Sequence, residues 1–393
     1  MKRTAKFSLF TLAAALVLTS CQQPTKRVQP TAIPDPWVLA QTPGAPINKP
    51  DKSAIKLAIA AKASPLMQAL ALVPNEVEAI SFTDWSRVKT SFGLANNNDI
   101  DLAKFATQIK EKTPFALYGL QYVETHAKDW GWGTADLIWE AVTRVGENPV
   151  YLLKLRDDFD LKAITDKFDT RKFTQFNYQG ATVYLHPASA QDYDKTTQRA
   201  VNVVALLPEE KLLVLSYQAK SVQTVLDVNA ALGPVFGTNP IISTLAQQMG
   251  DLDSIMLARP ALTCRTLDTL IKEQGVSGEA LKKVQASYAG QTVHAYDALG
   301  VGYQITAGKT TGHIHMAYAN ADDAKVDMPV RQGNIEKGLS LSAQQPYSTF
   351  FKLDKAEIAD NTQLRFTVTP ADNLPKNLWT VFSRLDLAFA RCP

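Results

Sequence analysis

The chain has 393 residues, of which 46% are hydrophobic and 20% are charged, as in an ordinary globular protein. It carries 41 Lys and Arg residues against 38 Asp and Glu, and residues 1–20 hold three basic residues and no acidic one. From residue 21 onward the chain therefore carries 38 charges of each sign, scattered along its length. Because nucleic-acid binding proteins usually cluster their basic residues, this balance excludes nucleic acid as the expected partner. The length is sufficient for two domains or two packed halves.

The N-terminus has the three parts of a secretory signal. A basic head over residues 2–6 precedes an apolar run over residues 7–18, and two small residues, Thr19 and Ser20, come before Cys21. The apolar run has about 12 residues, whereas a membrane-spanning helix needs about 20. This length predicts a cleaved signal peptide over residues 1–20 rather than a permanent membrane span.

The stretch Leu18-Thr19-Ser20-Cys21 resembles the lipobox of bacterial lipoproteins. The resemblance implies cleavage before Cys21, a diacylglyceryl group on its thiol and a further fatty acid such as palmitate. Two or more acyl chains give stable anchoring, at about 0.8 kcal/mol per buried CH₂. The implied location is the extracytoplasmic face of the cell membrane, or the outer membrane in a cell with two membranes, since Gln22 rather than Asp follows the cysteine. The alternative is an ordinary secretory signal followed by a chance cysteine.

Residues 21–50 are expected to form a tether. Seven prolines lie within residues 24–50, and proline removes hydrogen-bond donors and restricts the backbone. An extended Pro-rich segment of this length reaches up to about 90 Å. Trp37 and its apolar neighbours are unusual in a linker, so they dock either on the folded body or at the membrane interface. The sequence leaves both alternatives open.

The first half of the body is assigned to residues 51–235. Asp84 is expected to cap a helix that follows a strand ending at Thr83, and residues 137–145 are predicted as a strand because a Gly-Glu-Asn-Pro turn follows them. Further predicted helices cover residues 51–59, 65–72, 102–112, 161–168 and 221–229. Further predicted strands cover residues 77–83, 150–155, 173–178, 181–186, 201–207 and 211–217.

The second half is assigned to residues 236–393 and repeats this order of elements. Predicted helices cover residues 266–274, 278–287, 321–330 and 375–383. Predicted strands cover residues 254–258, 295–306, 312–318, 348–353, 362–369 and 385–390. The repeated order predicts an α+β protein with two similar halves, antiparallel sheets, packed helices and an internal duplication. Together with the lipobox and the strand ending Phe82-Thr83-Asp84-Trp85, this layout resembles exported bacterial lipoproteins of uncharacterised function, a group that implies no catalytic residues.

Motifs of known enzyme classes are incomplete in this chain. Gly308-Lys309-Thr310 resembles the end of a phosphate-binding loop, but Tyr303 stands where the preceding glycine is needed. The same stretch also resembles the Lys-Thr-Gly strand of penicillin-recognising enzymes. The Ser-x-Asn or Tyr-x-Asn motif of that family, however, does not occur between a Ser-x-x-Lys tetrad and Lys309. A turn between two strands is the favoured interpretation. No Gly-x-Ser-x-Gly elbow occurs either.

Two pairs of residues are candidate binding sites. His313 and His315 are two apart on a predicted strand, so their imidazoles point to one face and are candidate metal ligands, although a third ligand must come from elsewhere. Trp130 and Trp132, each followed by glycine, are candidates for an exposed stacking platform for a sugar or an apolar ligand. The alternatives are a solvated strand face for the histidines and burial in the core for the tryptophans.

Cys264 and Cys392 are the thiols that remain once Cys21 is lipidated. In an exported chain such thiols form lasting disulfides, and a bridge would hold the C-terminal segment against the start of the second half. The alternative is two separate buried thiols.

These observations predict a membrane-anchored extracytoplasmic lipoprotein that binds a partner without catalysis and without a cofactor. The expected partners are the membrane, through the anchor, and a protein, a glycan or a small apolar ligand. Two alternatives remain: an extracytoplasmic hydrolase with a site assembled from distant residues, and a structural or assembly factor of the envelope.

Overall fold

The computed structural model describes residues 64–94, 123–186 and 202–393 of the chain. All of them belong to one compact unit. The signal peptide, Cys21, the Pro-rich tether and the helices predicted over residues 51–59 and 102–112 lie outside the described residues. Predictions for these segments therefore stay predictions.

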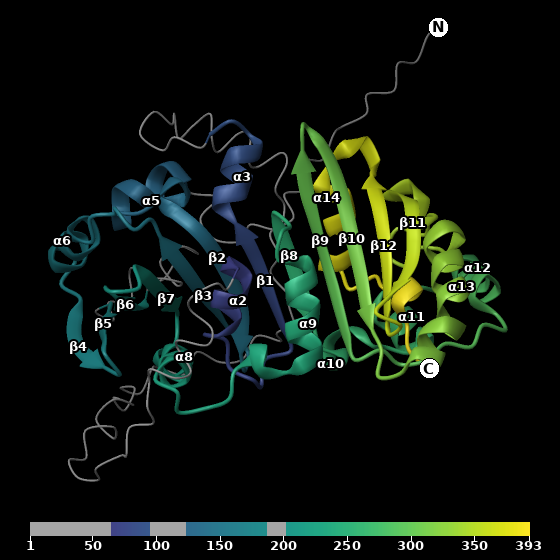
Figure 1. The fold of residues 1–393 in the computed structure, drawn as a ribbon, viewed down its shortest axis with the longest axis horizontal. Coiled ribbons are helices and arrows are strands. Elements are labelled where there is room, and N and C mark those ends of the chain that lie inside the picture. Colours follow the sequence, from purple (N-terminus) through teal and green to yellow (C-terminus); the bar gives the residue numbers. More distant parts are fainter. Residues whose placement is uncertain (1–63, 95–122, 187–201) are drawn as a thin grey trace, which may run out of the picture. The chain divides into compact units, whose positions relative to one another are not determined.

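One twelve-stranded sheet forms the centre of the fold, in the order β11-β12-β10-β9-β8-β1-β2-β3-β7-β6-β5-β4 (Figure 1). Each neighbouring pair of strands is antiparallel, which confirms the predicted α+β class. The strands are β1 Ala79–Asp84, β2 Leu137–Val145, β3 Asn148–Leu155, β4 Thr174–Tyr178, β5 Ala181–Leu185, β6 Val203–Leu207, β7 Leu212–Ser216, β8 Ser254–Ala258, β9 Ala298–Thr306, β10 Lys309–Ala317, β11 Phe351–Ala359 and β12 Gln363–Pro370.

The two predicted halves share this one sheet. Strands β1-β2-β3-β7-β6 of the first half stand in the same order as β8-β9-β10-β12-β11 of the second, and the hairpin β4-β5 is additional to the first. The halves join where β1 pairs with β8, with Phe82 opposite Ile255. The matching order agrees with the repeated pattern of elements in the sequence. An internal duplication is not confirmed by it and stays a prediction.

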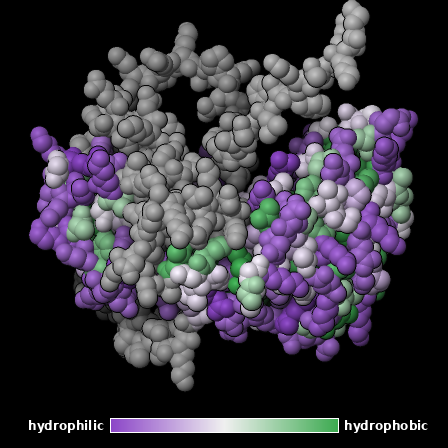
Figure 2. Space-filling model, turned by 90° about the horizontal axis from the view of Figure 1, so that it is seen from above, coloured by the Kyte–Doolittle hydropathy of each residue, from purple (hydrophilic) through white to green (hydrophobic). Residues whose placement is uncertain are grey.

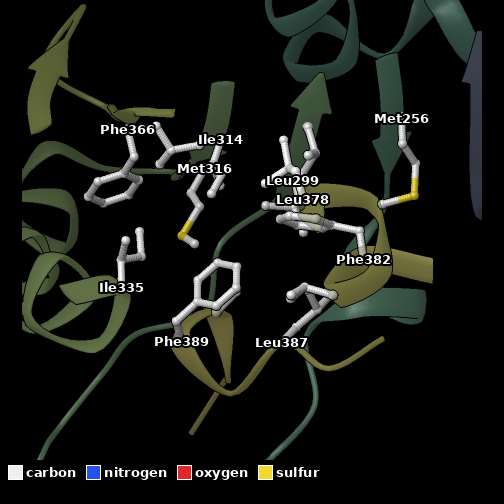
Figure 3. Close-up of a cluster of buried hydrophobic side chains, with 14 of the residues drawn as sticks. Met256, Leu299, Ile314, Met316, Ile335, Phe366, Leu378, Phe382, Leu387 and Phe389 are labelled. Atoms are coloured by element: carbon white, nitrogen blue, oxygen red, sulfur yellow. The ribbon is translucent and has the colours of Figure 1, made fainter. Parts of the chain in front are cut away.

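Helices cover both faces of the sheet. On one face of the second half, Leu299 and Met316 pack against Leu378 and Phe382 of α14 and Ile335 of α13 in a continuous apolar core (Figure 3). On the other face, α9 packs closely over β9. A side chain at Gly300 would collide with Met249 of α9, so glycine at this position allows the close approach. The described helices are α2 Pro65–Leu70, α3 Trp85–Ser91, α5 Val123–Trp130, α6 Lys162–Thr170, α8 Ala219–Asn229, α9 Pro240–Met249, α10 Pro260–Thr263, α11 Leu267–Glu273, α12 Gly278–Tyr288, α13 Ala321–Lys337 and α14 Pro375–Ser383.

Local sequence signals explain several of these boundaries. Asp84 accepts a hydrogen bond from the backbone N–H of Arg87 at 3.0 Å and caps α3, as predicted. Asn239 caps α9 in the same way and Pro240 occupies its first turn. Helix α9 was not predicted, although the sequence shows both the cap at Asn239 and the helical spacing of its buried residues, Ile242, Leu245, Ala246 and Met249.

Three predictions for the second half are wrong. The strand predicted over residues 348–353 is β11 Phe351–Ala359, because a 3₁₀ helix occupies Tyr347–Thr349. The terminal strand over residues 385–390 does not form, and the short 3₁₀ helix Ala388–Ala390 occupies its place, because this segment pairs with side chains and not with a neighbouring strand. Helix α13 continues past Val330 to Lys337 with Pro329 inside it. Proline has no N–H group to donate to the carbonyl of the preceding helical turn. Pro329 is exposed, so that carbonyl lies near water.

None of the helices in the described residues is both long and apolar enough to cross a membrane.

Candidate functional site

The predicted histidine pair lies on β10, with both rings on the same side of the sheet. The centroids of the His313 and His315 rings are 6.3 Å apart. His315 is buried, and its Nδ1 has no hydrogen-bond partner among the described residues. The pair therefore has the predicted orientation, but His315 does not lie on a solvated strand face.

The surroundings of the two imidazoles favour their neutral form. Burial, together with smaller contributions from Arg365 and His313, lowers the pKa of His315 to about 3. Burial also lowers the pKa of His313. Arg365 lies directly opposite His315 in the register of β10 and β12. Neutral imidazoles are metal ligands, but a nearby guanidinium repels a cation. Within the described ranges no group of three or more His, Cys, Asp or Glu residues is arranged to hold a metal ion. A metal ion bound by His313 and His315 therefore stays a prediction, and the described residues offer no third ligand of these types for it.

The structure contradicts the predicted aromatic platform. Trp130 and Trp132 are only 3% and 1% exposed and belong to the core of the first half. Trp132 packs edge-on against Phe168 of α6, and Arg171 lies over the Trp130 ring at 4.3 Å. These contacts use both rings for packing.

Glycine between the two indoles has a packing reason. Gly131 has a φ of +90°, which is unfavourable for other residues, and a side chain there would collide with the backbone carbonyl of Ala163 in α6. The Trp-Gly-Trp pattern therefore reflects close packing of two helices and not an exposed binding surface.

A second polar cluster, missed in the sequence, lies where the two halves join. Asp253 is 2% exposed and accepts a hydrogen bond from the backbone N–H of Ile305 at 2.7 Å. Arg87 lies 3.7 Å from its other oxygen. Burial raises the pKa of Asp253 to about 6, opposed by these two partners, and burial also raises the pKa of Asp84.

Both carboxylates of this cluster have structural partners. Asp84 caps α3, and Asp253 holds the end of β9 to the start of β8. Beside them, Thr83 and Ser254 share a hydrogen bond of 2.8 Å across the β1–β8 junction. A raised carboxyl pKa is typical of catalytic acids, but it also follows from burial alone. The arrangement connects the two halves.

The third polar cluster surrounds α13. Asp327 and Arg331 are fully buried and 3.0 Å apart. Asp327 also accepts hydrogen bonds from the backbone and ring nitrogens of His294 and from Tyr318. Arg331 donates to the backbone carbonyls of Phe389, Arg391 and His294. The four-residue spacing of Asp327 and Arg331 is a visible sequence signal, but their burial is not, because such pairs usually lie on an exposed helix face.

The predicted disulfide is confirmed: Cys264 and Cys392 are bonded, with their Cα atoms 5.1 Å apart. The backbone N–H of Cys392 donates to the carbonyl of Arg265 at 2.8 Å. Further along the same segment, buried Asp386 accepts hydrogen bonds from Ser340, Ser342, Tyr347 and the backbone of Leu341. The disulfide and these carboxylate bonds replace the strand pairing that the terminal segment lacks.

No family model and no curated protein matches this chain. Solved structures of TP0453 are similar to it over 80% of its length. Crystal forms I and III of TP0453 give TM-scores of 0.37 and 0.35 at 8% sequence identity, covering 96% and 97% of those chains. A likeness at this level does not define a shared function.

Proposed function

We propose that this chain is a lipid-anchored protein on the extracytoplasmic side of a bacterial cell envelope, whose folded body binds a partner and does not catalyse a reaction. The observation that carries the location is the disulfide between Cys264 and Cys392. Disulfides persist in exported proteins and are rare in the cytosol. This agrees with the secretory signal over residues 1–20, and the lipobox ending at Cys21 adds the anchor.

The chemistry of the buried polar groups supports a binding role. The carboxylates of Asp253, Asp327 and Asp386 each accept hydrogen bonds from backbone N–H groups. These carboxylates are thus used in structural contacts between segments of the fold. On the face shown in Figure 2, the described surface is mainly hydrophilic, with apolar residues in small patches.

The test of the anchor is metabolic labelling of cells with an alkyne analogue of palmitate. We expect Cys21→Ser to lose the label and to leave the membrane fraction, because the acyl chains attach to this thiol. The matched control is the pair Cys264→Ser and Cys392→Ser, which removes two cysteines and leaves the lipobox intact. Label retained by Cys21→Ser, or membrane association that survives high salt in that variant, would contradict the lipid anchor.

The test of the binding role is affinity capture of the lipidated chain from envelope extracts, with mass spectrometry of what it retains. A protein or glycan enriched equally by the wild-type and Cys21→Ser chains would bind the folded body. Turnover of ester, amide or glycoside substrates by the purified chain would support the hydrolase alternative instead.

A further inference from the structure

Helix α13 buries polar side chains as well as apolar ones. Its buried residues are Ala324, Asp327, Arg331, Asn334 and Ile335. Arg331 lies on this side because it donates hydrogen bonds to the backbone of the terminal segment. A helix at the surface usually turns its apolar side to the core, whereas in α13 the apolar residues Val326 and Pro329 are exposed.

The outer side carries an apolar stripe, which we define as Val326, Pro329, Val330 and Gly333. Their spacing of three, four and seven residues places them on one helix face. Val326 is 52% exposed, Pro329 is also exposed, and Val330 and Gly333 are half-buried. The helix packs against β11 at one end of the sheet (Figure 1). The exposure of Val326 and Pro329 places the stripe on the outer side of the helix.

Shape and charge along this stripe are self-complementary. Gly333 has no side chain, and a side chain there would meet no atom within 4 Å. The helix surface is therefore low and open at this position, which we call the notch, about two helical turns from the protruding Val326. Asp322 lies in line with the stripe before its first residue, and Lys337 lies in line after its last. An antiparallel copy of the helix therefore presents a base to each acid and a notch to each valine.

We propose that the apolar stripe of α13 is a contact between two copies of this chain, related by a two-fold axis near Pro329 and Val330. In this pairing Val326 of each copy enters the notch at Gly333 of the other, and Asp322 lies beside Lys337 of the second copy. An interface of this kind uses the same patch on both copies. The proposal does not depend on lipidation of Cys21.

The charges beside the stripe favour a second copy over a lipid surface. Asp322 and Glu336 are exposed, and Asp323 is partly exposed. Anionic lipid headgroups repel carboxylates. On the other flank of the stripe, Lys325 and Glu336 are exposed near opposite ends of the helix. The same antiparallel pairing brings Lys325 of one copy near Glu336 of the other.

The first test is the oligomeric state of the purified full chain, measured by sedimentation over a range of concentrations. Gly333→Leu fills the notch, and we expect it to raise the dimer dissociation constant by at least about tenfold. The monomer has open space at this site and leucine favours a helix, so its thermal stability should not fall. The matched control is Lys283→Leu, an added leucine at an exposed position of α12.

The second test is a charge exchange. Asp322→Lys alone and Lys337→Asp alone each place like charges together in the dimer and should weaken it. The double variant should restore the wild-type dissociation constant, an outcome that a contact elsewhere would not produce. All measurements are repeated with Cys21→Ser, so that association through acyl chains is excluded.

Three results would overturn the proposal: a chain that is monomeric at about 100 μM, a dimer that none of the α13 variants weakens, or single charge variants that the double variant does not rescue. Binding of the Cys21→Ser chain to anionic vesicles that Gly333→Leu abolishes would make the occupant a lipid surface instead.

Discussion

The two halves of the sheet differ in how they use buried charged side chains. Both have apolar cores with aromatic rings, and the first half buries Lys89 and Glu140, which are 3% and 1% exposed. The second half buries Asp327, Arg331 and Asp386 completely. The difference lies in what each half must cover. The first half ends in helix α8, whereas the second ends in a segment without regular strand pairing, whose backbone needs side-chain partners.

The largest expected effect is loss of the buried guanidinium in the second half. Arg331→Met keeps the length of the side chain but leaves Asp327 without its cation and the carbonyls of Phe389 and Arg391 without their donor. We expect the free energy of unfolding to fall by about 3–5 kcal/mol, measured by urea denaturation. The control in the first half is Trp132→Phe, a smaller apolar change, with an expected loss of about 1–2 kcal/mol. Equal losses in the two variants would remove the distinction between the halves.

A double variant sharpens the same comparison. An ordinary buried ion pair is often replaced by apolar residues without loss of stability. Asp327→Leu combined with Arg331→Met should still be destabilised, because the carbonyls of the terminal segment remain without donors. Wild-type stability in the double variant would show that the pair does not hold that segment.

The disulfide is expected to have the next largest effect. Cys264→Ser with Cys392→Ser opens a bridge that spans 128 residues of sequence, and we expect a loss of about 2–5 kcal/mol. Amide hydrogen exchange should locate the loss in residues 386–392 and in α11, with β4 to β7 unchanged. Exchange that accelerates evenly across the sheet would contradict this localisation.

The smallest expected effect is a pH dependence of opposite sign at two histidines of the second half. The hydrogen bond to Asp327 raises the pKa of His294, with Asp323 adding to the rise and Arg331 opposing it. A raised folded pKa means that the stabilisation by His294 is present below pH 6.5 and is lost as the pH rises through its folded pKa. Thermal unfolding between pH 5 and 8 should therefore show a slope that His294→Gln removes.

His315 is the control for this experiment. Because its folded pKa is lowered to about 3, stability falls as the pH decreases below 6.5, where the unfolded chain takes up a proton that the folded chain does not. His315→Gln should reduce that fall. Changes of the same sign in the two variants would contradict one of the two assigned environments.

Patterns that depend on neighbours in the sequence were predicted well. The strand β8, the cap of α3 by Asp84 and the hairpin turn at Gly308 follow from a few adjacent residues, and the structure has all three. The pairing of Cys264 with Cys392 was also predicted, because few thiols remain once Cys21 is assigned to the lipobox, and the structure has this disulfide.

What the sequence by itself determined is most of the helices and strands and the antiparallel α+β class. Export of the chain stays a prediction. Only the tertiary structure decided which side of each element is buried. Trp130 and Trp132 became core because α6 approaches Gly131, and Asp327 and Arg331 became buried because the terminal segment needs their hydrogen bonds. The physical reason is that the cost of burying a side chain depends on partners far away in the chain. A local pattern contains no information on those partners.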